Sequence, residues 1–298
     1  MVRSILNHVS LTRSLAIMAA LTWAAFSPFL IAQQGEPKTP PKTITINSLS
    51  MEVNALQALH QLQVSESQLN QLQKWAEESM PKDQQRKPGK ASKEYRDKLQ
   101  ELRKALQDAK DGDLIAKLVG EVDALHEKEK PTLDDRVEIT EAARKRAVEA
   151  YRLLKPGQVA AYLGQIADSI HDPRDLLLDA LEDVRNMNEE DWKDQRGEIA
   201  DEISRAAVGL NAAKAKAMSA QIAVLLTRAR GLSKAEFQKQ HAEIESAASK
   251  LIGDISPEVL LRNQVEVDLA MLLSNPRTPQ AARALLKVTS QAKTPSKK

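Results

Sequence analysis

Apolar residues recur at intervals of three and four along this 298-residue chain, the spacing that places them on one face of an α-helix. The first such stripe comprises Leu49, Val53, Leu56, Leu59 and Leu62. Aromatic residues make up only 3% of the chain and glycine contributes only 10 residues, which leaves little material for strands and their turns. The sequence therefore predicts an all-α fold. Its amphipathic helices are joined by short Pro, Gly or Ser turns and form helical hairpins or a bundle, with two helical subdomains as one arrangement.

The N-terminal segment has the pattern of a secretory signal. A basic leader, Met1–Arg13, precedes an uncharged apolar run, Leu15–Ala32. An uncleaved anchor is the alternative, because about 18 apolar residues can span a bilayer. Ser27 and Pro28 interrupt the run and favour cleavage. In either case we expect the rest of the chain to be exported to the periplasm or secreted. It would contact a membrane only through this segment, if the segment is retained.

Changes in composition divide the chain into five segments. The boundary after residue 171 is marked by charge, because residues 172–202 carry twelve acidic and four basic side chains, a net charge of −8. The expected segments are a signal peptide or anchor (1–32), a Pro-rich linker (33–46), a helical domain (47–171), a second helical region (172–288) and a disordered tail (289–298).

The charge balance argues against nucleic acid as a partner. The chain has 43 basic and 41 acidic residues, and two of the basic ones, Arg3 and Arg13, lie in the leader. The remainder carries 41 of each sign and has no general attraction for nucleic acid or anionic membranes. We therefore expect protein partners.

Known catalytic and metal-binding patterns are missing from the sequence. The chain has no cysteine, and its glycines form no phosphate-binding loop. Four histidines follow the leader, and none is paired at the spacing that puts two imidazoles on one helix face: His60, His126, His171 and His241. We expect no enzyme activity, no cofactor, and no catalytic, cofactor-binding or metal-binding residues.

A helix start is encoded by Val64-Ser65-Glu66-Ser67-Gln68-Leu69. Ser65 can accept a hydrogen bond from the backbone N–H of Gln68, whose side chain can reach back to Ser65. This reciprocal arrangement is a capping box. Val64 and Leu69 occupy the two positions of a hydrophobic staple across it.

A second start follows at Leu154-Lys155-Pro156-Gly157-Gln158-Val159. Pro156 takes the first helical position, where its missing N–H costs nothing. Leu154 and Val159 are again placed as a staple, with Gln158 at the third position. Similar capping signals predict further helix starts at Ser92, Thr132, Asn188, Ser233 and Ser256.

Both of these motifs read apolar-x-x-x-Gln with another apolar residue directly after, and a basic, Pro-containing loop and charged amphipathic helices lie between them. Over residues 55–170 the chain thus resembles the periplasmic LTxxQ family, typified by the helical chaperones Spy and CpxP. Val64 and Ser65 stand where the family pattern has Leu and Thr, and Lys155 replaces Thr in the second copy. The resemblance implies a thin, curved, all-helical homodimer that binds clients on its concave surface without ATP or modulates envelope stress.

The sequence thus predicts an exported helical binding protein, chaperone-like or associated with envelope stress, whose partners are protein clients or an envelope protein. A structural or scaffolding protein of the cell envelope is the alternative. The eight motif residues are expected to fix helix starts rather than to touch a ligand. They are Val64, Ser65, Gln68, Leu69, Leu154, Pro156, Gln158 and Val159.

Overall fold

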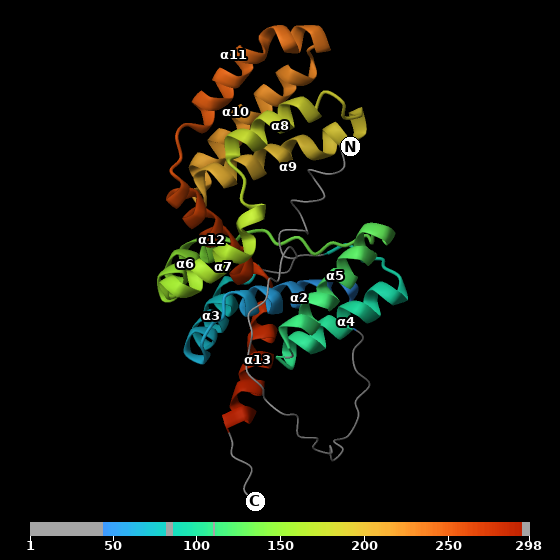
Figure 1. Cartoon of the computed structure of the whole chain (residues 1–298), viewed down its shortest axis with the longest axis vertical. Helices are drawn as coiled ribbons and strands as arrows, with labels where there is room; N and C mark the ends of the chain where they lie inside the picture. Colours follow the sequence, from blue (N-terminus) through green and yellow to red (C-terminus); the bar gives the residue numbers. More distant parts are fainter. Residues whose placement is uncertain (1–43, 82–85, 110, 294–298) are drawn as a thin grey trace, which may run out of the picture.

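The computed structural model describes residues 44–81, 86–109 and 111–293, and this part of the chain is all-α, as predicted. The expected signal segment and nearly all of the expected linker lie outside it. The described residues form twelve α-helices, which are labelled in Figure 1, and a short 3₁₀ turn, η2 (Ala167–Ser169). The helices are α2 (Ile46–Gln61), α3 (Glu66–Ser79), α4 (Lys93–Gln107), α5 (Gly112–Glu129), α6 (Glu141–Leu153), α7 (Pro156–Ile166), α8 (Pro173–Asp183), α9 (Glu189–Val208), α10 (Ala212–Arg230), α11 (Lys234–Ile252), α12 (Pro257–Ser274) and α13 (Thr278–Lys293).

Most helix starts lie where the capping signals place them. The predicted residues at the starts of α3, α4, α9, α11 and α12 each accept a hydrogen bond from the backbone N–H three residues on. These caps satisfy backbone donors that the first turn leaves unpaired. The C-terminal end differs from expectation. Helix α13 continues to Lys293, into the segment expected to be disordered, and the hydroxyl of Thr289 donates to the carbonyl of Leu285 one turn earlier.

The predicted helix start at Thr132 is wrong. Thr132 instead forms an isolated antiparallel bridge with Lys90 through two backbone hydrogen bonds of 2.8 and 2.9 Å. The helix begins only after Thr140, whose hydroxyl accepts from the N–H of Ala143. Contacts with α2 hold the intervening segment: the backbone N–H of Asp134 donates to Asn47, 3.1 Å away. Long-range pairing outweighs the local cap at this position.

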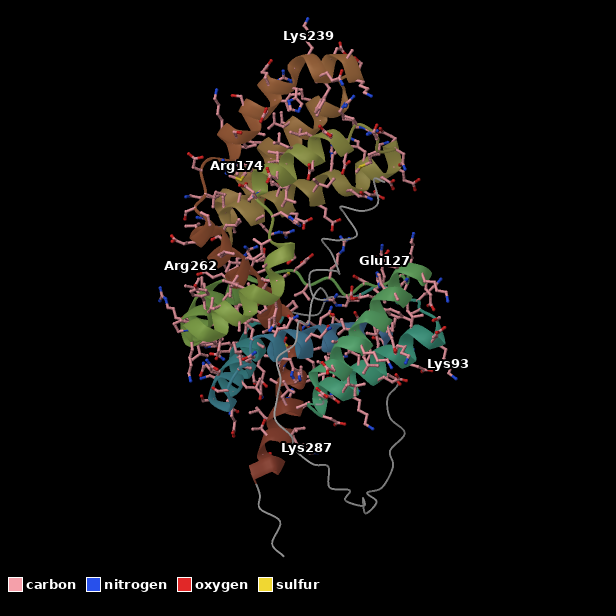
Figure 2. All side chains as sticks on the ribbon, viewed as in Figure 1. Lys93, Glu127, Arg174, Lys239, Arg262 and Lys287 are labelled. Carbon is pink, nitrogen blue, oxygen red and sulfur yellow. The ribbon has the colours of Figure 1, made fainter. Side chains whose placement is uncertain are left out.

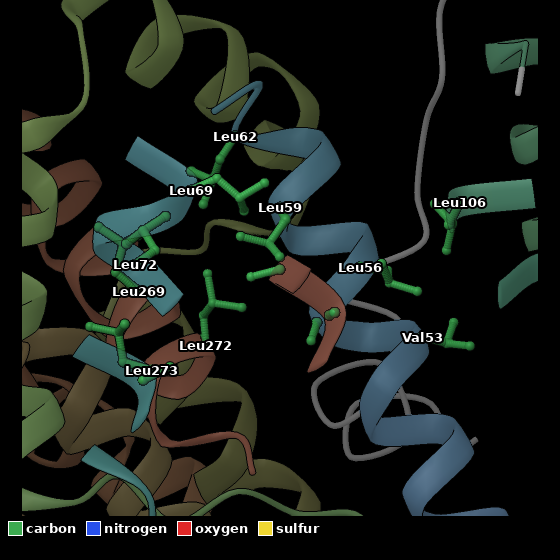
Figure 3. Packing of buried hydrophobic residues seen from close by; sticks show 14 of the residues in the cluster. Val53, Leu56, Leu59, Leu62, Leu69, Leu72, Leu106, Leu269, Leu272 and Leu273 are labelled. Atoms are coloured by element: carbon green, nitrogen blue, oxygen red, sulfur yellow. The ribbon is translucent and has the colours of Figure 1, made fainter. Parts of the chain in front are cut away.

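Apolar side chains gather in two separate clusters, while charged groups project from the outer faces of the helices (Figure 2). The first cluster joins α2–α7 with α12 and α13. Within it, Leu69 and Leu72 of α3 lie beside Leu269, Leu272 and Leu273 of α12 (Figure 3). The second cluster joins α8–α11, which form the upper part of Figure 1. Helix α12 packs on both α6 and α9 and so connects the two bodies.

The C-terminal helices complete the first cluster. Asn275, which follows α12, donates from Nδ2 to the carbonyl of Met51 on α2 at 2.8 Å, and the pair is buried. The guanidinium of Arg277 donates to the hydroxyl of Ser48 at 2.7 Å. The expected second region, 172–288, therefore does not share one core, because its last two helices pack with the first region.

Candidate functional site at the paired helix starts

The first helix start forms the complete capping box that the sequence predicts. Ser65 has extended backbone angles (φ −71°, ψ 165°), and its Oγ accepts from the N–H of Gln68 at 3.4 Å. In return, Oε1 of Gln68 accepts from the N–H of Ser65 at 2.8 Å. Two backbone donors at the start of α3 are thus satisfied by one pair of side chains.

The second start has the same backbone geometry with half of the box. Lys155 lies at φ −75°, ψ 149°, and Oε1 of Gln158 accepts from its N–H at 2.9 Å. The ammonium group of Lys155 has no lone pair, so this side chain cannot accept the return hydrogen bond. Pro156 begins α7 and is exposed. The backbone N–H of Gln158 bonds the Lys155 carbonyl at 2.9 Å instead.

The two motif glutamines are hydrogen-bonded to each other although 90 positions separate them. Nε2 of Gln68 donates to Oε1 of Gln158 at 2.9 Å, and Nε2 of Gln158 donates to Oε1 of Gln68 at 3.1 Å. The starts of α3 and α7 are therefore joined by a reciprocal amide pair. Sequence reasoning predicted each start separately and missed their contact, because nothing in the local pattern encodes a partner 90 residues away.

Each glutamine also binds the chain just before the other helix. Nε2 of Gln68 donates to the carbonyl of Leu153 at 2.8 Å, and Nε2 of Gln158 donates to that of Gln63 at 2.7 Å. Leu153 lies two residues before Lys155, the N-cap of α7, and Gln63 lies two residues before Ser65, the N-cap of α3. The hydrogen bonds at the two starts are thus reciprocal, and α3 packs on α6 while α2 packs on α7.

The apolar members of the two motifs anchor this junction in the first hydrophobic cluster. Leu69 and Leu154 are buried, at 4% and 7% exposure. Val64 and Val159 are partly buried and pack against the same cluster. Their placement agrees with the expected staples.

The two amides are saturated. A carboxamide carries two N–H donors and one acceptor oxygen. Each N–H₂ group here has at least two acceptors within 3.2 Å, and each oxygen accepts from both a backbone N–H and the opposite amide. Gln68 is also only 5% exposed. The arrangement orients two helix starts and leaves these groups no free donor with which to hold a ligand.

A second polar grouping, which the sequence did not suggest, lies between α2, α4 and α5. These helices line a cavity with an apolar floor and with Tyr95, Asp123 and His126 among its walls. Nδ1 of His126 lies 3.3 Å from the hydroxyl of Tyr95. Burial raises the pKa of that hydroxyl, and the carboxylates of Asp135 and Asp123 raise it further. From the sequence alone, His126 is an isolated histidine, because Tyr95, which it contacts, lies on another helix.

Within the described part of the chain, no group of three or more His, Asp or Glu side chains is placed to hold a metal ion. Among the helices of residues 44–81, 86–109 and 111–293, none is both long and apolar enough to cross a bilayer. Comparison with protein-family models, with curated proteins and with solved structures found no match to this chain.

Proposed function

We propose that this protein is an exported, periplasmic or secreted helical binding protein that holds protein clients without ATP. The observation that supports this proposal is the amide pair between Gln68 and Gln158. The two LTxxQ-like motifs are hydrogen-bonded to each other at the starts of α3 and α7, so they form a single structural unit. These are the two motifs on which the resemblance to the LTxxQ chaperones rests.

The exposed surface indicates how clients would be held. Five large apolar side chains of the described residues are substantially exposed, and they are spread over the end of α3 and over α5, α10 and α12: Met80, Leu114, Val224, Val259 and Met271. Scattered single residues of this kind do not form a hydrophobic docking patch. Clients would therefore meet amphipathic helix faces that are largely polar and charged.

An aggregation assay tests the proposal directly. The full chain is added to a chemically denatured client at less than one copy per client, and light scattering is followed as the client is diluted out of denaturant. The proposal predicts lower scattering than with the same amount of an inert helical protein, and no response to ATP. Unchanged scattering at every ratio would contradict it.

The alternative is a structural or scaffolding protein of the envelope, and one observation favours it. The two hydrophobic clusters form two bodies joined through α12, so each body could hold a different fixed partner. A scaffold would bind its partner in a fixed ratio and leave client aggregation unchanged. The ratio in a cross-linked complex, measured alongside scattering, separates the two functions.

Export has its own test. If the leader is removed, the intact mass of the mature chain should correspond to a start between Ala24 and Gln34. A full-length chain that stays with the membrane fraction would instead support the anchor.

A further inference from the structure

The cavity between α2, α4 and α5 combines an apolar floor with polar groups on opposite walls. Its floor is formed by Val53, Leu99, Leu102 and Val122, all of them buried. Surfaces of this kind accept a methylene chain. The acidic wall of the cavity belongs to α5, on which Glu127 is labelled in Figure 2.

Two amides on the α2 wall have no hydrogen-bond partner among the described residues. Gln57 is only 5% exposed, and Asn54, one turn earlier, is half-buried; both line the cavity. A buried polar group without a partner is costly, so such groups are normally paired with protein, water or a ligand. Their neighbour Ser50 differs, because its hydroxyl donates to Asp135. Because both residues line the cavity, their amides are available to a polar group taken up by it.

The facing wall on α5 carries the carboxyl groups of Asp123 and Glu127 without a basic partner among the described residues. Asp123 is partly buried and forms neither an ion pair nor a hydrogen bond in the part of the chain that the structure describes. Burial, and next the carboxylate of Glu127, raise its pKa to about 7. A cation beside Asp123 would favour the ionised carboxylate and relieve this penalty.

We propose that this cavity binds an alkyl cation, the side chain of a lysine or arginine of a bound protein segment. Its methylene chain lies on the floor formed by Val53, Leu99 and Leu102. Its N–H groups donate to the Asp123 carboxylate and to the amide oxygens of Gln57 and Asn54. That the cation belongs to a protein segment rests on the proposed function, whereas the existence of the cation site does not.

Methyl NMR of the full chain tests the site with small probes. n-Hexylammonium, 1-hexanol and hexanoate share a six-carbon chain and differ in charge. We expect hexylammonium to shift the methyl signals of Val53, Leu99, Leu102 and Val122 in a saturable way, and the other two probes to bind at least about tenfold more weakly. Equal shifts with 1-hexanol would overturn the proposal, because the floor alone would then explain binding.

Variants assign the charge. Asp123→Asn should weaken hexylammonium binding about tenfold, while replacing the partly buried carboxyl by an amide of the same size should leave folding intact. Asp113→Asn is the matched control, because Asp113 lies exposed in the first turn of the same helix and outside the cavity. Unchanged affinity in Asp123→Asn would contradict the proposal. Gln57→Leu, of similar volume, provides the second readout and should weaken hexylammonium while sparing 1-hexanol.

The source of the cation is tested with acetyl-Ala-Lys-Ala-amide, its norleucine analogue and cadaverine. Tighter binding of the lysine peptide than of cadaverine supports a protein segment, and the reverse order would overturn that source. The norleucine peptide should fail to compete with hexylammonium. If the chain suppressed no aggregation yet bound hexylammonium through Asp123, the proposed function would fail and the site would stand.

Discussion

The side-chain amides of Gln68 and Gln158 hydrogen-bond each other in both directions, at 2.9 and 3.1 Å. Each amide also binds the N-cap N–H of its own helix and a carbonyl just before the other helix. One pair of side chains thus fixes the starts of α3 and α7 and links these two starts to each other. We interpret the two motifs as a junction in the fold, in which both glutamine amides form their hydrogen bonds within the protein.

Gln68→Ala should lower the free energy of unfolding by about 2 kcal/mol, because the part-buried carbonyl of Leu153 and the N–H of Ser65 lose their side-chain partner and Gln158 loses one of its partners. Ser65→Ala should cost about 1 kcal/mol, as expected for loss of an N-cap. The capping box alone predicts the opposite order. Urea unfolding measures both, and Gln73→Ala on the same helix is the control, because that amide binds only Glu77. A larger effect at Ser65 than at Gln68 would contradict the junction.

Lys155→Ser should stabilise the protein by about 0.5–1 kcal/mol, because a serine at this N-cap can supply the missing half of the second box. The backbone of Lys155 already has the extended geometry of Ser65. Lys155→Ala controls for loss of the charge and should give no comparable gain. Thermal unfolding of the three proteins provides the comparison, and equal melting temperatures for serine and alanine would contradict the prediction.

The sequence predicted the helices well because their signals are local. Capping residues and apolar spacing act within one or two turns, so starts such as Ser65 and Ser233 could be read directly. The predicted helix start at Thr132 was wrong because this segment is held by hydrogen bonds to Asn47 of α2 and to Lys90, both of which are distant in sequence. Asn275, which binds Met51 from 224 positions away, shows the same limit for the return of α12 and α13 to the first cluster.

The same distinction between local and long-range signals applies to the candidate site. The sequence predicted that Gln68 and Gln158 belong to helix starts, and the structure bears this out. It did not predict that they pair, nor that Gln57 and Asp123 line a common cavity. These relationships depend on how helices pack, and a single sequence carries no local signal for them.

The buried carboxylate of Glu52 gives a stability prediction. Its Oε1 accepts from Nε of Arg103 at 2.7 Å and from Nε2 of Gln107 at 3.0 Å, while Oε2 has no partner among the described residues. Arg103→Ala should therefore destabilise the protein by about 3 kcal/mol, because it leaves a charge buried and unpaired. Glu52→Gln should cost less, since the neutral amide is less expensive to bury. Urea unfolding would contradict the prediction if the two changes had equal effects.

Asp123 should make stability depend on pH. Its pKa is about 7 in the folded protein, against about 3.9 for an unfolded chain. Between these values the folded state keeps the proton, so this group's contribution to stability falls as pH rises from about 4 to 7. Asp123→Asn should match the wild type near pH 4 and exceed it by about 1–2 kcal/mol at pH 8, allowing for solvent screening.

The pH prediction depends on the groups around Asp123. Glu127 and His126 lie on the same helix, and Tyr95 lines the cavity from α4. Glu127 raises the pKa of Asp123, while Asp135, in the segment before α6, acts on Tyr95. Asp113→Asn on the same helix controls for loss of a surface charge. A constant difference between Asp123→Asn and the wild type across this range would contradict the prediction.

A double-mutant cycle on Gln68 and Gln158 tests the junction most directly. Trp75 lies in the first cluster and Trp192 in the second, so Trp75 fluorescence in a Trp23→Phe/Trp192→Phe background reports urea unfolding of the relevant body. We predict that Gln68→Ala and Gln158→Ala are non-additive by about 1 kcal/mol or more, with the double variant losing less than the sum. Additivity within about 0.3 kcal/mol would show that the two helix starts are independent and would contradict the account.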